Sequence, residues 1–360
     1  MAMLPEMLHP PSDAHPRRSS PVSIAACSVF VIATLRVGRA LALPIVIAVL
    51  LTLTLRAPVR WLAQHRIPAR LGAALVVFGV IAVAGGATAL IASPAMEWIA
   101  SAPHTIQTVE TKVRRIMKPF NALEQSADRM QQAAGPSGTR PPTMVQVATP
   151  GVVERLTTGS LLAIPATLSV VFLTYFLLAN NALARRKLAR LLPGPVELDR
   201  RERVLDQIEL AASHFLVTVS VVNLGVGLAT SLALWLIGVP NAVLWGSIAG
   251  VLNFVPYLGP MVTTTLIAIA ATASIDSLTH ALVAPAVVLA IHLTESNVVT
   301  PFALGRHLPL NTVAIFLGLL LFGWMWGIPG AVLAVPLTVC VRLVCDYVPA
   351  LAHVGELLDN

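Results

Sequence analysis

Charged residues are scarce in this chain. Only 11% of its 360 residues are Asp, Glu, Lys or Arg, whereas 56% are hydrophobic. A soluble domain has about 25% charged residues, so the composition excludes an ordinary soluble protein. Between residues 210 and 341 the only fully charged side chains are Asp276, Glu295 and Arg306. An apolar stretch of this length predicts an integral membrane protein.

Cysteine is also rare, and its positions do not suggest a metal site. Cys27, Cys340 and Cys345 all lie in or beside apolar segments, without the paired spacing of metal ligands or of a disulfide framework. The chain also lacks a metalloprotease helix motif, a Gly-rich phosphate loop with Lys, and a nucleophile elbow. We therefore expect no enzymatic activity, no cofactor, no bound metal and no ATP hydrolysis within this chain.

The basic residues point to a membrane rather than to nucleic acid. The net charge is +7, but the bases stand in short segments beside apolar sequence, as in Arg56, Arg60, Arg66 and Arg70, with no acid among them. Such clusters mark the cytoplasmic side of membrane proteins. A nucleic-acid surface would need a basic patch with interleaved aromatic residues, which the sequence does not have. The expected partner is the lipid bilayer.

The apolar stretches predict an all-α, polytopic membrane protein. About eight of them have the size of a membrane segment, and two of these are broken or re-entrant. In chain order we predict a disordered cytoplasmic tail (1–20), three spans (21–93), an extracytoplasmic helical insert and linker (94–156), a fourth span (157–180), a cytoplasmic amphipathic helix (181–213), a C-terminal membrane region (214–346) and a cytoplasmic tail (347–360).

Two apolar regions of the C-terminal half, 241–273 and 312–344, are interrupted near their middles. The interrupting residues are Pro256, Gly259 and Pro260 in the first region and Gly327 and Gly330 in the second. Each region is either a re-entrant hairpin or one long kinked span. Hairpins would place Arg306 in the cytoplasm, as the positive-inside rule favours, and kinked spans would place it outside. Irregular backbone at membrane depth is tolerated inside protein or beside water, so both breaks are candidate parts of a transport pathway.

The intact helix predicted between these regions, 279–303, carries Glu295. A carboxylate in such a segment costs roughly 2 to 3 kcal/mol to insert, so it needs a partner, a proton or a water-filled cavity. Pro301 cannot donate a hydrogen bond to the carbonyl of Asn297 and so leaves that oxygen free. Glu295, this carbonyl, and the side chains of Asn297 and Thr300 would form an oxygen-rich site for a proton, a sodium ion or a hydroxyl-rich solute.

The same polar residues also have structural interpretations. Glu295 would then only pair with Arg306 or cap a loop at the membrane edge. His292, three residues before Glu295 and on the same helical face, is either a proton relay or a buried histidine bonded to neighbouring backbone. Asn223 and Asn253 either bind substrate or form hydrogen bonds between helices.

Four local patterns then follow one another along the C-terminal half. They are Gly238-Val239-Pro240-Asn241-Ala242-Val243-Leu244-Trp245-Gly246, Asn253-Phe254-Val255-Pro256-Tyr257-Leu258-Gly259-Pro260, Glu295-Ser296-Asn297-Val298-Val299-Thr300-Pro301, and Trp326-Gly327-Ile328-Pro329-Gly330 with Ala334-Val335-Pro336-Leu337. Together these resemble the AI-2E family of bacterial transporters, from residue 22 to residue 345. The resemblance implies a homo-oligomeric, multi-pass protein of the bacterial inner membrane with cytoplasmic N- and C-termini. It also implies either export of the quorum-sensing signal autoinducer-2 or sodium/proton antiport.

Three functions are therefore considered. The leading hypothesis is a secondary transporter that exports a small hydrophilic molecule, with the broken segments forming the pathway and Glu295 coupling transport to protons or cations. The second is a sodium/proton antiporter, in which the ion itself is the substrate. The third is a non-transporting scaffold whose extracytoplasmic insert recruits a partner. Helices broken at membrane depth disfavour the scaffold, which has no need of them.

Overall fold

The structure is built from helices. The computed structural model describes residues 30, 32–132, 152–191, 198–304 and 311–347. In chain order the helices are α2 (Arg39–Gln64), α3 (Ala69–Gln132), α4 (Val152–Ala179), α5 (Asn181–Leu191), α6 (Leu198–Ile237), α7 (Ala242–Leu252), α8 (Leu258–Ser274), α9 (Leu278–Thr294), the π-helix η1 (Glu295–Val299), α10 (Thr300–Leu304), α11 (Thr312–Trp326) and α12 (Ile328–Tyr347).

Several of these helices are suited to a membrane. In the described part of the chain, five are long and apolar enough to cross one, or six if the bent pair Ile164–Ala179 and Leu183–Arg190 counts as one span. Helices α7, α8 and α11 are apolar but shorter. The predicted all-α, polytopic membrane fold is confirmed.

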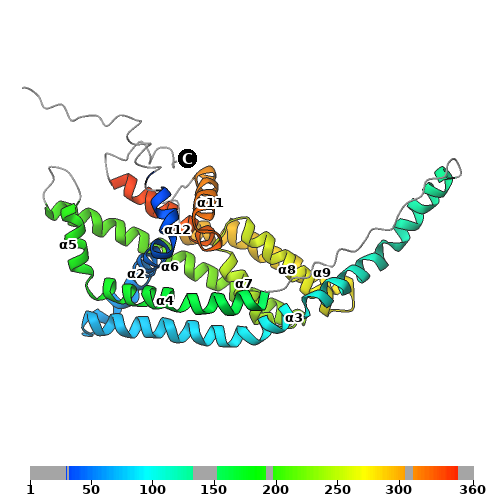
Figure 1. Ribbon diagram of the computed structural model, residues 1–360, viewed down its shortest axis with the longest axis horizontal. Coiled ribbons are helices and arrows are strands. Elements are labelled where there is room, and N and C mark those ends of the chain that lie inside the picture. Colours follow the sequence, from blue (N-terminus) through cyan, green and yellow to red (C-terminus); the bar gives the residue numbers. More distant parts are fainter. Residues whose placement is uncertain (1–29, 31, 133–151, 192–197, 305–310, 348–360) are drawn as a thin grey trace, which may run out of the picture.

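Helices α2, α3 and α4 pack against one another in the N-terminal half. Val59 of α2, Ala73 and Val77 of α3, and Leu178 of α4 form a buried apolar cluster. Figure 1 shows α3 and α4 side by side along one edge of the molecule. The inward faces of the three helices make these contacts. Their outer faces are also largely apolar, as expected of helices that contact lipid.

Two helices run further than the spans predicted from the sequence. Helix α3 has 64 residues and joins the third predicted span to the first part of the insert, so it measures about 96 Å along its curved axis. Its C-terminal part projects away from the rest of the molecule (Figure 1). Helix α6 has 40 residues and joins the end of the predicted amphipathic segment 181–213 to the start of the predicted C-terminal membrane region without a boundary. No proline interrupts α6, and its charged first part has partners within the protein.

Ion pairs hold the charged first part of α6 against α2 and α5. The buried Arg56 of α2 donates hydrogen bonds to the carboxylates of Asp206, at 2.9 Å, and of Glu209. Arg185 of α5 donates to the same Asp206 at 2.6 Å, and Arg60 lies 3.4 Å from it. The charged residues of the predicted amphipathic segment therefore join α2, α5 and α6.

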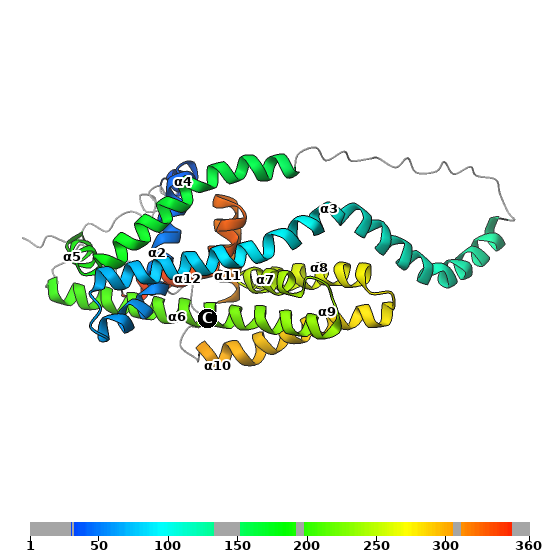
Figure 2. The ribbon, with the colours of Figure 1, turned by 90° about the horizontal axis from the view of Figure 1, so that it is seen from below.

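Helices α6 to α9 run back and forth in the C-terminal half. In Figure 2, α6 runs toward the right, α7 returns, α8 runs toward the right again, and α9 returns. Ala242 and Trp245 of α7 share a buried cluster with Ile267 and Ala270 of α8. Helices α7 and α8 contact each other and run in opposite directions (Figure 2). The first interrupted region is thus a helical hairpin.

The second interrupted region is a helical hairpin as well. A Cβ atom on Gly318 of α11 would overlap the hydroxyl of Thr338 of α12, and one on Gly323 would lie 3.8 Å from Cβ of Ala331. The chain reverses at Gly327, whose φ of +69° is a conformation that side-chain-bearing residues rarely adopt. The two alternatives were a hairpin and one long kinked span, and both regions have the hairpin form. Arg306 lies outside the described residues, so the side of the membrane on which it stands stays a prediction.

Lys112, in the part of α3 that continues beyond the predicted third span, binds the C-terminal end of α8. Its Nζ donates hydrogen bonds to the carbonyl oxygens of Thr272 and Ile275, at 3.0 Å each, and lies 4.0 Å from a carboxylate oxygen of Asp276. The last carbonyls of a helix have no partner within the helix, and a lysine is a favourable one. The base of the insert is therefore attached to the connection between α8 and α9.

Replacing Lys112 by methionine should loosen the α8–α9 connection. The two carbonyls would lose a charged donor, which we expect to cost about 1 kcal/mol of local stability. Hydrogen exchange followed by mass spectrometry should then show faster exchange for residues 271–278 and no change in α11. Lys187→Met on the exposed face of α5 is the control. Equal protection of residues 271–278 in both variants would mean that the Lys112 contacts contribute nothing.

Candidate functional site

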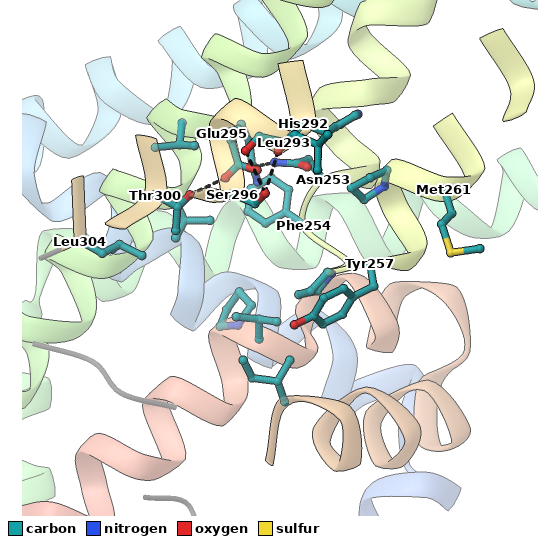
Figure 3. Close-up of a pocket in the computed structure, with 18 of the residues that line it drawn as sticks. Asn253, Phe254, Tyr257, Met261, His292, Leu293, Glu295, Ser296, Thr300 and Leu304 are labelled. Atoms are coloured by element: carbon teal, nitrogen blue, oxygen red, sulfur yellow. Dashed lines mark hydrogen bonds between the residues drawn. The ribbon is translucent and has the colours of Figure 1, made fainter. Parts of the chain in front are cut away.

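A cavity of about 570 Å³ lies between α6, the α7–α8 break, the segment α9–η1–α10, and the α11–α12 hairpin. Its lining is mainly apolar, with Phe215, Leu289 and Val335 among the contributing residues. The polar side chains that line it are Asn223, Asn253, Tyr257, His292, Glu295, Ser296 and Thr300. Both interrupted regions thus contribute to one cavity, and Figure 3 shows the polar residues of α9 and η1 gathered together.

Glu295 and Thr300 meet at this cavity across a widened helical turn. The hydroxyl of Thr300 donates a hydrogen bond to Oε1 of Glu295. The backbone N–H of Thr300 donates to the carbonyl oxygen of Glu295, five residues earlier, as in a π-helix. Pro301 accounts for the irregularity, because its ring has no N–H and clashes with a carbonyl four residues back. Residues five apart are not neighbours on an α-helix, so the π-helix is what brings these two side chains together.

His292 is deeply buried beside Glu295. Its side chain is on the cavity wall, the residue is 3% exposed, and within the described residues neither ring nitrogen has a hydrogen-bond partner. The neighbouring backbone carbonyl of His292 instead accepts from Ser296 Oγ at 2.9 Å. The ring therefore borders the cavity, with both of its nitrogens enclosed by protein.

The two buried amides face each other across the α6–α7 contact. Nδ2 of Asn253, at the C-terminal end of α7, donates to Oδ1 of Asn223 on α6 at 2.9 Å. Asn223 is 4% exposed, and its own Nδ2 has no partner in the part of the chain that the structure describes. The pair thus joins α6 and α7 at the edge of the cavity, which both residues line.

The structure brings only part of the predicted pathway to the cavity. Residues that line it are Glu295, Thr300, His292, Asn253, Pro256 and Pro260. Asn297 and Pro301 are not among the lining residues. The side chain of Asn297 is exposed and donates to the carbonyl oxygen of Leu293 at 2.8 Å. Pro301 affects the site only indirectly, through the π-helix that precedes it.

The predicted glycines have packing or turn roles. A Cβ atom on Gly259 would overlap the carbonyl of Leu252, and one on Gly330 would overlap that of Phe322. Gly327 makes the exposed turn between α11 and α12.

Sequence reasoning missed two features of the site. The first is the π-helix, for which Pro301, shortly after an intramembrane carboxylate, was the available signal. The second is Tyr257, which lines the cavity with a φ of +62°, in the left-handed region that non-glycine residues rarely enter. No pattern around Tyr257 other than its place between Pro256 and Gly259 indicates this conformation.

Comparison with known proteins now identifies the family. The model of the family described as AI-2E family transporter matches residues 25–350. The chain belongs to the AI-2E transporter family. The AI-2 transport protein TqsA of Escherichia coli (strain K12) is 24% identical over 337 residues, which cover 92% of this chain and 93% of TqsA. YhhT of the same strain is 25% identical over 323 residues, covering 87% of this chain and 86% of YhhT.

Membership of the AI-2E family confirms three predictions made from the sequence. The resemblance drawn from the four local patterns is correct, the protein is a multi-pass membrane transporter, and it is not an enzyme. A transporter of this family works in a lipid bilayer and moves a solute. The solute and the coupling ion are matters for proposal.

Proposed function

We propose that this AI-2E transporter is a secondary transporter that exports a small hydrophilic molecule, similar to autoinducer-2, across the bacterial inner membrane. The cavity would hold the solute, and Glu295 would couple its movement to protons or cations. The observation that carries the proposal is that a lone carboxylate and its hydroxyl partner, Thr300, face a cavity lined by both helical hairpins. The name of TqsA, an AI-2 transport protein, supports the choice of solute.

Two further parts of the proposal concern the arrangement in the membrane. The bases Arg60, Arg66 and Arg70, around the turn between α2 and α3, favour a cytoplasmic position for that turn by the positive-inside rule. We propose that both termini lie in the cytoplasm, and the hairpin topology is consistent with this orientation. The family resemblance supports a homo-oligomer.

Sodium/proton antiport is a second candidate function. The observation that favours it is the cluster of oxygen atoms from Glu295, Thr300 and Ser296 on one wall of the cavity. Hard cations prefer such oxygen ligands, but they commonly take about six of them. The described side chains offer fewer, so we rank antiport below solute export. A scaffold without transport is the least favoured, since it would not require a polar site inside the protein.

The test is flux in inside-out proteoliposomes. Uptake of autoinducer-2 would be measured with and without an imposed proton gradient, and pH change inside the vesicles would be measured on addition of sodium without any organic solute. Gradient-dependent uptake is the expected result. A sodium-dependent pH change without solute uptake would favour the antiporter. Absence of both fluxes from protein that is folded and correctly inserted would contradict the transport proposal.

A further inference from the structure

The cavity has more apolar surface than a wholly hydrophilic solute requires. Most of its polar groups gather on the wall formed by α9 and η1, with Asn253 beside them, whereas the hydroxyl of Tyr257 lies apart from this group (Figure 3). Phe215 and Val219 of α6 and Val335 of α12 give the cavity apolar surface. A solute that is polar all over would leave these side chains facing polar atoms or water, without the favourable burial of apolar area.

We propose that the solutes of this cavity extend beyond small hydrophilic ones to amphipathic molecules that have an uncharged or cationic polar end and an apolar body, an inference that rests on the proposed role of the cavity as the transport site. The polar end would contact Glu295 and the Asn223–Asn253 pair. The apolar body would lie against the side chains of α6 and α12. A volume of about 570 Å³ lies within the range of pockets that take drug-sized molecules.

The charge of the lining determines which polar end is accepted. Glu295 is the acidic residue among the described lining residues, which include no Lys or Arg. In surroundings of low polarity a bound anion would face this carboxylate without a compensating cation, which is costly. An ammonium or hydroxyl group would instead donate a hydrogen bond to the carboxylate, and bonds to a charged partner are the stronger ones. The site therefore selects against carboxylates and phosphates.

The neighbours of Glu295 determine what else the polar end must offer. The amide of Asn253 and the hydroxyl of Ser296 also line the cavity, beside Glu295 (Figure 3). A hydroxyl group both donates and accepts, and thus suits the carboxylate and these neutral groups together.

Binding to protein in lipid nanodiscs tests this inference without requiring transport. The probes are hexanol, hexylamine and hexanoate, which share one apolar body, and glycerol, which has none. Partition into empty nanodiscs is subtracted. We expect hexanol and hexylamine to bind at least about tenfold more tightly than hexanoate, and glycerol to bind more weakly than hexanol. Hexanoate binding as tightly as hexylamine, or glycerol as tightly as hexanol, would overturn the inference.

Matched variants locate the binding in the cavity. Val222 lines the cavity, whereas its neighbour Val221 is 62% exposed and is not a lining residue. Val222→Phe should weaken hexanol binding by about tenfold, and Val221→Phe should leave it unchanged. Glu295→Gln should weaken hexylamine binding by about tenfold and hexanol binding much less. Equal effects of the two valine variants, or unchanged hexylamine binding in Glu295→Gln, would contradict the assignment.

The binding and flux experiments can fail separately. Probe binding of the expected pattern without any gradient-dependent flux would contradict the proposed function and keep the ligand class. Gradient-dependent flux of autoinducer-2 without saturable binding of hexanol or hexylamine would keep the transporter and reject the amphipathic ligand. Because the Glu295 variant removes charge and not volume, its result can be read even if Val222→Phe does not fold.

Discussion

Glu295→Gln is expected to abolish the part of the flux that depends on an imposed gradient. Glutamine has nearly the shape of glutamate, and its amide oxygen can still accept from the Thr300 hydroxyl that now donates to Glu295. It cannot take up a proton or balance the charge of a cation. We expect a fall of at least about tenfold in gradient-dependent uptake by inside-out proteoliposomes, since bonds to charged groups contribute about 1.5 to 3 kcal/mol.

The matched control for this variant is Asp276→Asn. Asp276 is the other acid between residues 210 and 341, and its side chain is fully exposed between α8 and α9. The same acid-to-amide change there should leave flux within about twofold, because exposed charge pairs contribute little. If flux and its pH dependence were the same in wild type and in Glu295→Gln, Glu295 would have only a structural role and the coupling proposal would be wrong.

Gly246→Ala is expected to destabilise the contact between α6 and α7 severely. A Cβ atom at Gly246 would overlap the backbone carbonyl of Gly227 and the hydroxyl of Ser231, both on α6. A backbone carbonyl within a helix cannot move aside without displacing the helix. Overpacking of this kind costs typically 1 to 3 kcal/mol and more in tight sites, so we expect a loss of about 3 kcal/mol in the free energy of unfolding.

Chemical unfolding in detergent, followed by circular dichroism, measures this loss. Gly225→Ala is the control, because Gly225 also lies within α6 and a Cβ atom there would meet nothing within 4 Å. Alanine is favoured over glycine in a helix by about 1 kcal/mol, so this variant should be as stable as wild type or more so. Equal unfolding curves for the two alanine variants would show that α6 and α7 separate readily.

Local sequence was enough to predict the helices and their interruptions. Apolar stretches of membrane length, and proline or glycine within them, act through neighbouring residues, so Pro256 and Gly327 could be assigned to breaks in advance. The hairpin form of these breaks was one of two alternatives, because the reversal depends on packing between residues such as Gly318 and Thr338. That packing is not visible in either helix alone.

Long-range partners account for most of what the sequence did not predict. Asp206 was predicted only to lie in an amphipathic helix, 181–213, whereas Arg56 of α2 and Arg185 of α5 bind it. Asn223 and Asn253 were both recognised as buried amides, but their hydrogen bond joins residues thirty positions apart. The sequence thus indicated which residues are chemically notable and left open which of them meet.

The π-helix at Glu295–Val299 also fixes the register of everything that follows it. A π-turn contains one residue more than the α-helical turn it replaces, and a residue corresponds to about 100° of rotation in an α-helix. The face of α10 is therefore turned relative to the apolar pattern of α9, and Leu304 reaches the cavity in this rotated frame. An ordinary helical wheel would place Leu304 about 20° from Leu293, whereas the extra residue of the π-turn places it about 20° from His292 instead.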